Sequence, residues 1–180
     1  MTRREMLDTL DASWRTLDEA VAGLGEADQM EPGVVGSWLI KDVLGHVTAW
    51  DSLVVQYLEH WRRGEPPPVR DWDSTDDYNA REVARRQDWT LAQIMAEAVD
   101  IRRRLRALIA GVTDEEWATV VTITDRERPL GEWVAGATSG NDGPSTHAAE
   151  HAAAIRAWRS AREGSLAARH PRSDEHNRPV

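Results

Sequence analysis

The chain has 180 residues, 41% of them hydrophobic, which suits a single domain with a sizeable core. Its formal net charge is −9, from 22 basic and 31 acidic residues. This balance disfavours a dedicated nucleic-acid-binding protein, because such proteins bind chiefly by neutralising phosphates. We interpret the arginine run over residues 102–106 as a solvated helix face interleaved with Asp and Glu. Because there is no cysteine, any metal site must use nitrogen and oxygen ligands.

The chain shows no signal for a membrane or for secretion. The N-terminal sequence has no apolar stretch of signal-peptide length, and no later segment approaches the ~18 apolar residues that span a bilayer. We therefore expect a cytoplasmic protein with no nucleic-acid partner and no membrane partner.

The first predicted helix begins near Thr2 and ends at about Gly25. Thr2 and Glu5 have the spacing of a capping box. Apolar residues then recur at intervals of three and four, which places them on one face: Leu7, Leu10, Trp14, Leu17, Val21 and Leu24. Residues 26–36 contain a proline and two glycines and are predicted to be a connector.

A second apolar stripe predicts a helix from about Leu39 to Arg63, with Gly64 as its stop signal. Residues 65–77 contain three prolines and five acidic residues, so they are predicted to form a long crossover loop. A short helix then leads to a third long helix, whose apolar periodicity extends over residues 90–111.

The last third of the chain is less regular. Residues 118–144 follow no sustained period, and a β-like excursion is one option for them. Ser145 or Thr146 can cap a fourth helix that continues to Arg162. Residues 164–180 are polar and lack an apolar period, which predicts a disordered tail.

Four helical stripes without a sustained strand pattern predict an all-α protein, an antiparallel four-helix bundle formed by residues 1–163. The long crossover loop would connect its second and third helices.

Histidines stand out on two of the predicted helices. His147 and His151 are four residues apart, so a helix places both imidazoles on one face. That face continues into Ile155 and Trp158, an apolar stripe that should face the core. His46 lies at the edge of the stripe on the second helix. Either the pair is a chance surface spacing, or all three rings are buried together and share a cation.

The run GSWLIKDVLGHVTAWD over residues 36–51, with HAAEHAAAIRAW about a hundred residues later, resembles the DinB-like superfamily, in the branch related to ClbS and DfsB. The resemblance implies a four-helix bundle in which His46, His147 and His151 bind one divalent metal ion. Leu39 departs from the family pattern, which usually has Ser or Thr as the helix cap at this position. ClbS itself lacks this histidine set, so the metal-binding branch with mycothiol-dependent isomerases and bacillithiol transferases is the closer guide.

Three neutral imidazoles leave open coordination positions on zinc, nickel, iron or manganese. Water in such a position has a lowered pKa, and a low-molecular-weight thiol can replace it. We therefore expect a metal-dependent hydrolase, or a thiol-dependent transferase or isomerase, that acts on a small electrophile in detoxification or self-resistance. The competing hypothesis is a noncatalytic metal-binding or stress-response bundle that acts through a protein partner or as a homodimer.

For other side chains near the expected ligands, the sequence leaves more than one role open. Tyr57 either donates a proton into a pocket or is a core tyrosine, and Asp51 either supports a metal-ligating histidine or is solvated. Glu150 should point away from His151 and lie at the surface. Trp50 is expected to wall a pocket, and residues 78–79 are placed to cover the mouth of the bundle.

Overall fold

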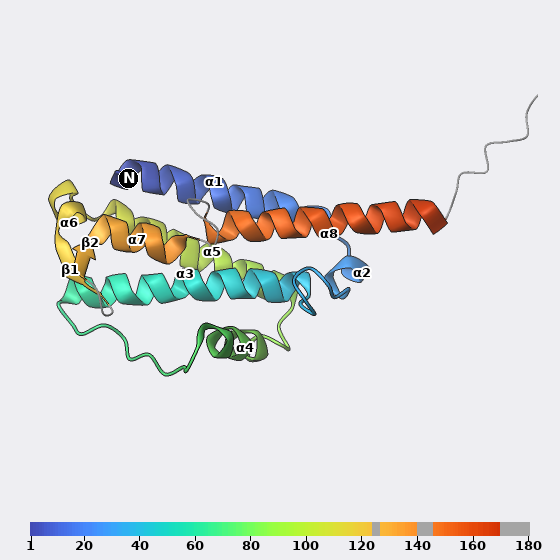
Figure 1. Ribbon diagram of the computed structural model, residues 1–180, viewed down its shortest axis with the longest axis horizontal. Helices are drawn as coiled ribbons and strands as arrows, with labels where there is room; N and C mark the ends of the chain where they lie inside the picture. The colour runs from blue at the N-terminus through green and yellow to red at the C-terminus, as the bar shows by residue number, and fades with distance from the viewer. Residues whose placement is uncertain (124–126, 140–145, 170–180) are drawn as a thin grey trace, which may run out of the picture.

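A computed structural model describes residues 1–123, 127–139 and 146–169, and these residues are mainly helical (Figure 1). The long helices are α1 (Arg3–Val21), α3 (Ile40–Arg63), α5 (Leu91–Ala110) and α8 (His147–Arg169). The short ones are α2 (Glu26–Gln29), α4 (Thr75–Arg85), α6 (Asp114–Ala118) and α7 (Leu130–Thr138). The predicted all-α four-helix bundle is confirmed.

The crossover connection sets the direction of the helices. In Figure 1, α3 and α5 run in one direction, and α1 and α8 run in the opposite one. The most extensive helix contacts join α3 to α5 and α1 to α8. The connection between α3 and α5 returns the chain to the end of the bundle at which α3 begins. Helix α4 lies in the second half of this connection. Consecutive long helices α3 and α5 are therefore parallel to each other.

Local hydrogen bonds explain where α1 and α3 begin. The Thr2 hydroxyl accepts from the Glu5 backbone N–H at 3.2 Å, and the Glu5 carboxylate accepts from the Thr2 N–H at 2.7 Å, which confirms the predicted capping box. At α3, the Asp42 carboxylate accepts from the backbone N–H of Leu39 at 3.0 Å, so this end is stabilised without a Ser or Thr cap. Gly64, in the left-handed conformation with φ 66°, ends α3 as predicted.

Two boundaries differ from the sequence prediction. Helix α1 ends at Val21, and the short α2 lies inside the predicted connector. Helix α8 continues past Gly164 to Arg169, although the sequence predicted a disordered tail from this glycine onward. One exposed glycine costs a helix only ~1 kcal/mol, which packing elsewhere on α8 can offset. Residues 170–180 lie outside the described residues.

The region without a clear sequence pattern contains a hairpin and a helix. Strand β1 (Val120–Thr122) pairs antiparallel with β2 (Glu127–Pro129), so the β-like excursion is confirmed. Helix α7 follows and packs against α3 and α6. A Cβ at Gly131 would lie 2.3 Å from the Trp117 Nε1, so only glycine lets α7 pack this closely on α6.

The arginine run of α5 is neutralised by acidic side chains. Each of its four arginines forms an ion pair with a carboxylate: Arg102 with Asp18, Arg103 with Asp100, Arg104 with Glu59, and Arg106 with Asp11. Only Asp100 belongs to α5 itself, and Arg102 is buried rather than solvated, whereas the other three arginines are exposed as predicted. The bundle core beneath is formed by fully buried aliphatic side chains, among them Leu10, Leu17, Leu44, Ile94, Leu105, Ile109 and Ile155.

Candidate metal centre

Three histidines meet inside the bundle. His46 lies in α3, and His147 and His151 lie in the first two turns of α8. The Nε2 atom of His147 is 2.9 Å from Nε2 of His46 and 3.0 Å from Nε2 of His151. One ring nitrogen from each residue lies within 4.8 Å of the other two. The fold therefore brings together the three residues that were expected to ligate a metal.

The packing of α8 and α3 accounts for this convergence. Ile155, one turn after His151, is fully buried, so the histidine face of α8 continues into the core as predicted. His46 is 6% exposed and lies on the face of α3 that also buries Val43 and Val47. The first turn of α8 is held by Thr146, whose hydroxyl accepts from a backbone N–H at 3.3 Å. The alternative cap, Ser145, lies outside the described residues.

Burial keeps the three imidazoles neutral. It lowers the pKa of His46 to about 3, with help from charge repulsion by the other two rings and against the effect of Asn79. Burial, with repulsion from His151, also lowers the pKa of His147 to about 3. The pKa of His151 is lowered by burial too, although Glu150 opposes this. Near neutral pH each ring therefore offers a lone pair and carries no charge.

This arrangement fits a divalent cation better than a hydrogen-bonded set. A neutral imidazole has one donor and one acceptor nitrogen, yet Nε2 of His147 faces two other nitrogens at hydrogen-bond distance. A shared cation would engage all three lone pairs at once. Among the described residues the cluster contains three histidines and no carboxylate, so the protein would supply three donors.

Aromatic rings surround the histidine cluster. The ring centroids of Trp38 and Trp50 lie 4.9 Å and 6.4 Å from that of His46. The Trp50 indole N–H donates to the Asn79 side-chain oxygen at 3.0 Å, and its ring packs on Tyr78 at 4.8 Å between centroids. Helix α4 thus fixes the orientation of Trp50, which agrees with a cover formed by residues 78–79.

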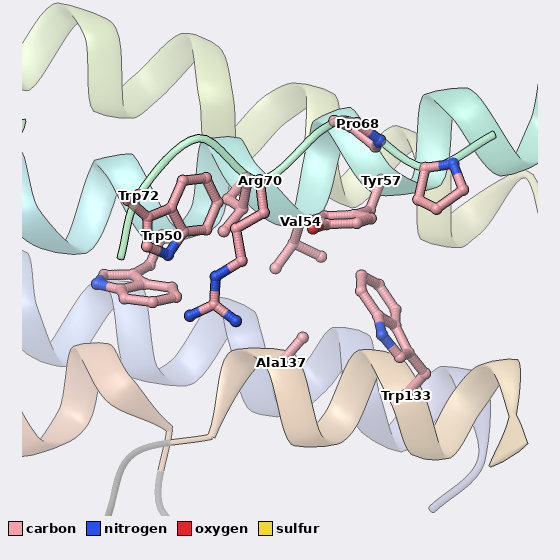
Figure 2. A pocket seen from close by; sticks show the side chains of 10 residues that line it. Trp50, Val54, Tyr57, Pro68, Arg70, Trp72, Trp133 and Ala137 are labelled. Carbon is pink, nitrogen blue, oxygen red and sulfur yellow. The ribbon is translucent and has the colours of Figure 1, made fainter. Parts of the chain in front are cut away.

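A cavity of about 500 Å³ lies on the other side of Trp50, and none of the three histidines lines it (Figure 2). It lies between α3, α7 and the extended part of the crossover, and Trp50 and Tyr57 both line it. The Trp50 ring also lies 6.4 Å from the His147 ring, so one side chain borders both the cavity and the histidines. Trp50 therefore occupies the position of a pocket wall, and the Tyr57 side chain, although 7% exposed, reaches the same pocket.

The two acidic candidates lie in different surroundings. The Asp51 carboxylate accepts a hydrogen bond from the Trp14 indole at 3.0 Å and faces Arg102, so it belongs to the interface of α3 with α1 and α5. Burial raises its pKa to about 7, against the effects of Arg102 and the Trp14 hydrogen bond. It is thus not solvated, and its hydrogen bond is made to Trp14 rather than to a histidine. Glu150 is half-buried, and its charge raises the pKa of His151.

Sequence reasoning missed two residues that line the cavity, Arg70 and Trp72. Both lie in the proline-rich segment that was predicted only as a crossover loop. The one available signal was a tryptophan in a strongly acidic stretch, because such a large apolar side chain is seldom left in solvent. Asn79 was placed near the mouth of the bundle, but its hydrogen bond to Trp50 could not be inferred from the pattern.

Comparison with known proteins identifies the family. Residues 9–139 match the family model of the DinB superfamily, a range that includes His46 and ends before α8. No curated protein sequence matches the chain. Among the described residues, no helix is long and apolar enough to cross a membrane.

Solved structures show the same fold at low sequence identity. An uncharacterised protein from Escherichia coli UTI89 is 17% identical, with a TM-score of 0.72, covering 90% of this chain and 95% of the other. The colibactin self-resistance protein ClbS is 12% identical, with a TM-score of 0.71 and coverages of 88% and 95%. The mycothiol-dependent maleylpyruvate isomerase is 15% identical, with a TM-score of 0.68. The match covers 86% of this chain but only 61% of the isomerase. Such similarity shows the fold alone.

One of these structures corrects an expectation. The acidic composition led us to exclude a nucleic-acid partner, but the structure of ClbS was determined in complex with a dsDNA. That exclusion was wrong, because net charge describes the whole chain while a nucleic acid contacts only a local surface. A nucleic-acid partner is therefore possible for this fold.

Proposed function

Because the chain belongs to the DinB superfamily and brings three neutral imidazoles together, we propose that it is a metal-dependent enzyme. In this proposal His46, His147 and His151 hold one divalent ion. The protein then processes a small electrophile, either as a hydrolase or as a thiol-dependent transferase or isomerase. One protein of the same fold is a mycothiol-dependent isomerase, which supports including a thiol among the reactants to be tested.

The observation that carries this proposal is the position of the histidine cluster beside the cavity. Trp50 lines the cavity, and its ring centroid lies 6.4 Å from those of His46 and His147. When bound, a divalent ion would supply Lewis acidity and an exchangeable coordination position. A donor set of three imidazoles accepts zinc, nickel, iron or manganese. A noncatalytic metal-binding bundle would have no need for a cavity next to its ligands, so the cavity favours an enzyme.

The side chains of the cavity have separable roles. Trp50, held by Asn79 and Tyr78, forms a wall of the cavity and also packs near the histidines. Burial raises the pKa of Tyr57, although Arg70 opposes this, so the phenol stays protonated at neutral pH. Tyr57 can therefore donate a proton or a hydrogen bond to a molecule in the cavity.

An activity screen tests the proposal. The protein would be loaded in turn with zinc, nickel, ferrous iron and manganese, and assayed against small electrophiles with water, mycothiol or bacillithiol. We expect turnover in at least one combination. His147→Ala should lose both metal and turnover, whereas His60→Ala should keep both, because His60 contacts Pro66 in the same helix–loop region away from the cluster.

A second variant separates the metal from the proton donor. Tyr57→Phe should retain the metal and lower turnover by about 10²-fold or more, the usual contribution of general acid catalysis. Equal rates for the wild type and His147→Ala in every combination would contradict the proposed function. An unchanged rate in Tyr57→Phe would instead show that Tyr57 is a core residue without a role as proton donor.

A further inference from the structure

The cavity lined by Trp50 and Tyr57 contains one cationic side chain without a carboxylate partner among the described residues. Arg70 lines it and carries its guanidinium into the space between α3 and α7 (Figure 2). Among the residues that the structure describes, none forms an ion pair with Arg70, whereas the arginines of α5 are all paired. The lining of the cavity includes no Asp or Glu. In a chain with net charge −9, this is a local site that favours an anion.

The remaining walls are flat and apolar. Three indole rings face the cavity, those of Trp50, Trp72 and Trp133, and prolines of the crossover segment complete it. The Arg70 guanidinium lies 5.1 Å from the centroid of the Trp72 ring, which supports its orientation by a cation–π contact. A volume of about 500 Å³ is within the range of small-molecule pockets. Rings in these positions favour a planar apolar body.

The Tyr57 hydroxyl is a further hydrogen-bond donor on the same walls. Burial raises the pKa of Tyr57, so its hydroxyl keeps its proton, and Arg70 is close enough to act on this pKa. Carboxylates accept several hydrogen bonds and match the planar fork of a guanidinium.

We propose that this cavity binds a small carboxylate with a planar apolar body, the carboxylate at Arg70 and the body between Trp50 and Trp133. This proposal names the substrate class of the proposed function. The binding mode itself does not depend on that function, but the statement that the bound molecule is a substrate does. The carboxylate orients the molecule, because its only cationic partner in the lining lies on the crossover segment.

Calorimetric titration with a matched pair of probes tests this binding mode. The probes are 1-naphthoate and 1-naphthamide, which share a planar body and differ in charge. We expect the wild-type protein to bind the acid about tenfold more tightly than the amide, as for a charge-assisted hydrogen-bonded pair. Arg70→Gln should abolish this difference. Arg63→Gln should preserve it, because Arg63 loses the same charge but pairs with Glu65 outside the cavity.

The same titrations on chelated protein separate this proposal from the proposed function. A preference for the acid that persists without metal and requires Arg70 supports the binding mode, even if the metal site fails. A preference that disappears on chelation but survives Arg70→Gln would place the carboxylate at the histidines and overturn the role of Arg70. Equal affinities for the acid and the amide, equal losses in the two arginine variants, or no binding of either probe would also overturn it.

Discussion

At the scale of single residues, Asp51 is a buried carboxyl group outside the histidine cluster. Its pKa is raised to about 7 in the folded protein, mainly by burial, whereas the unfolded chain has a value near 3.8. Between these values the folded state binds more protons than the unfolded state. The free energy of unfolding therefore decreases through this group as pH rises from about 4 to about 7.

This gives a prediction for Asp51→Asn. The amide keeps an oxygen that can accept the hydrogen bond from Trp14 and cannot ionise. The variant should match the wild type near pH 4 and be more stable at pH 8, by an amount of the order of 1–3 kcal/mol. Urea denaturation at the two pH values measures this.

Asp8→Asn is the matched control, because Asp8 is exposed and only weakly paired with Arg4. Its stability should change by less than about 0.5 kcal/mol at both pH values. An Asp51→Asn variant that is less stable than the wild type at pH 8 would show that the ionised carboxylate stabilises the fold through Arg102.

At the scale of elements, the contact between α6 and α7 depends on a glycine. A Cβ at Gly131 would approach the indole of the buried Trp117 to 2.3 Å, and the ring would have to move. Gly131→Ala should therefore destabilise the protein by about 1–3 kcal/mol, the usual cost of overpacking.

Gly136 provides a control in the same helix. A Cβ there meets only the flexible end of Arg128, at 3.4 Å. Gly136→Ala should be neutral or slightly stabilising, because alanine is the better helix former. Thermal unfolding of both variants tests the pair, and similar melting temperatures for the two would contradict this account of how α7 packs.

The elements that sequence reasoning predicted well carry strong local signals. Helices α1, α3 and α5 have apolar periodicity, and their ends have caps or a left-handed glycine that can be recognised from a few residues. Helix α7 was not predicted, because the glycine that its packing requires resembles a helix breaker when read alone. The same limitation explains the boundary error at Gly164.

The candidate site also contains a part that was predicted, the histidines, and a part that was not, the cavity wall. The spacing of His147 and His151 and the apolar stripe beside His46 left a chance pair open, and the family resemblance selected the three residues that converge. The cavity wall was not predictable, since Arg70 and Trp72 reach it through an irregular segment whose path depends on packing against α3 and α4. The position of Asp51 likewise depends on Trp14, which lies 37 positions earlier in the sequence.

At the scale of the whole molecule, the histidine cluster depends on two helices that are far apart in the sequence. His46 and His147 are separated by 101 positions, and the bundle brings α3 to the start of α8. The aromatic cavity lies between α3, α7 and the crossover segment, and Trp50 is the lining residue that also packs near the histidines. The central claim is therefore that the bundle holds one metal ion at this junction, with an exchangeable position toward the cavity.

Anomalous diffraction from crystals of the zinc-loaded protein tests this claim most directly. It should show one zinc ion per chain, within about 2.0–2.1 Å of a ring nitrogen of each of the three histidines. Any remaining ligand should be a solvent molecule on the side of Trp50. Zinc bound elsewhere, or a fourth protein side chain completing the coordination sphere at the histidines, would contradict the account.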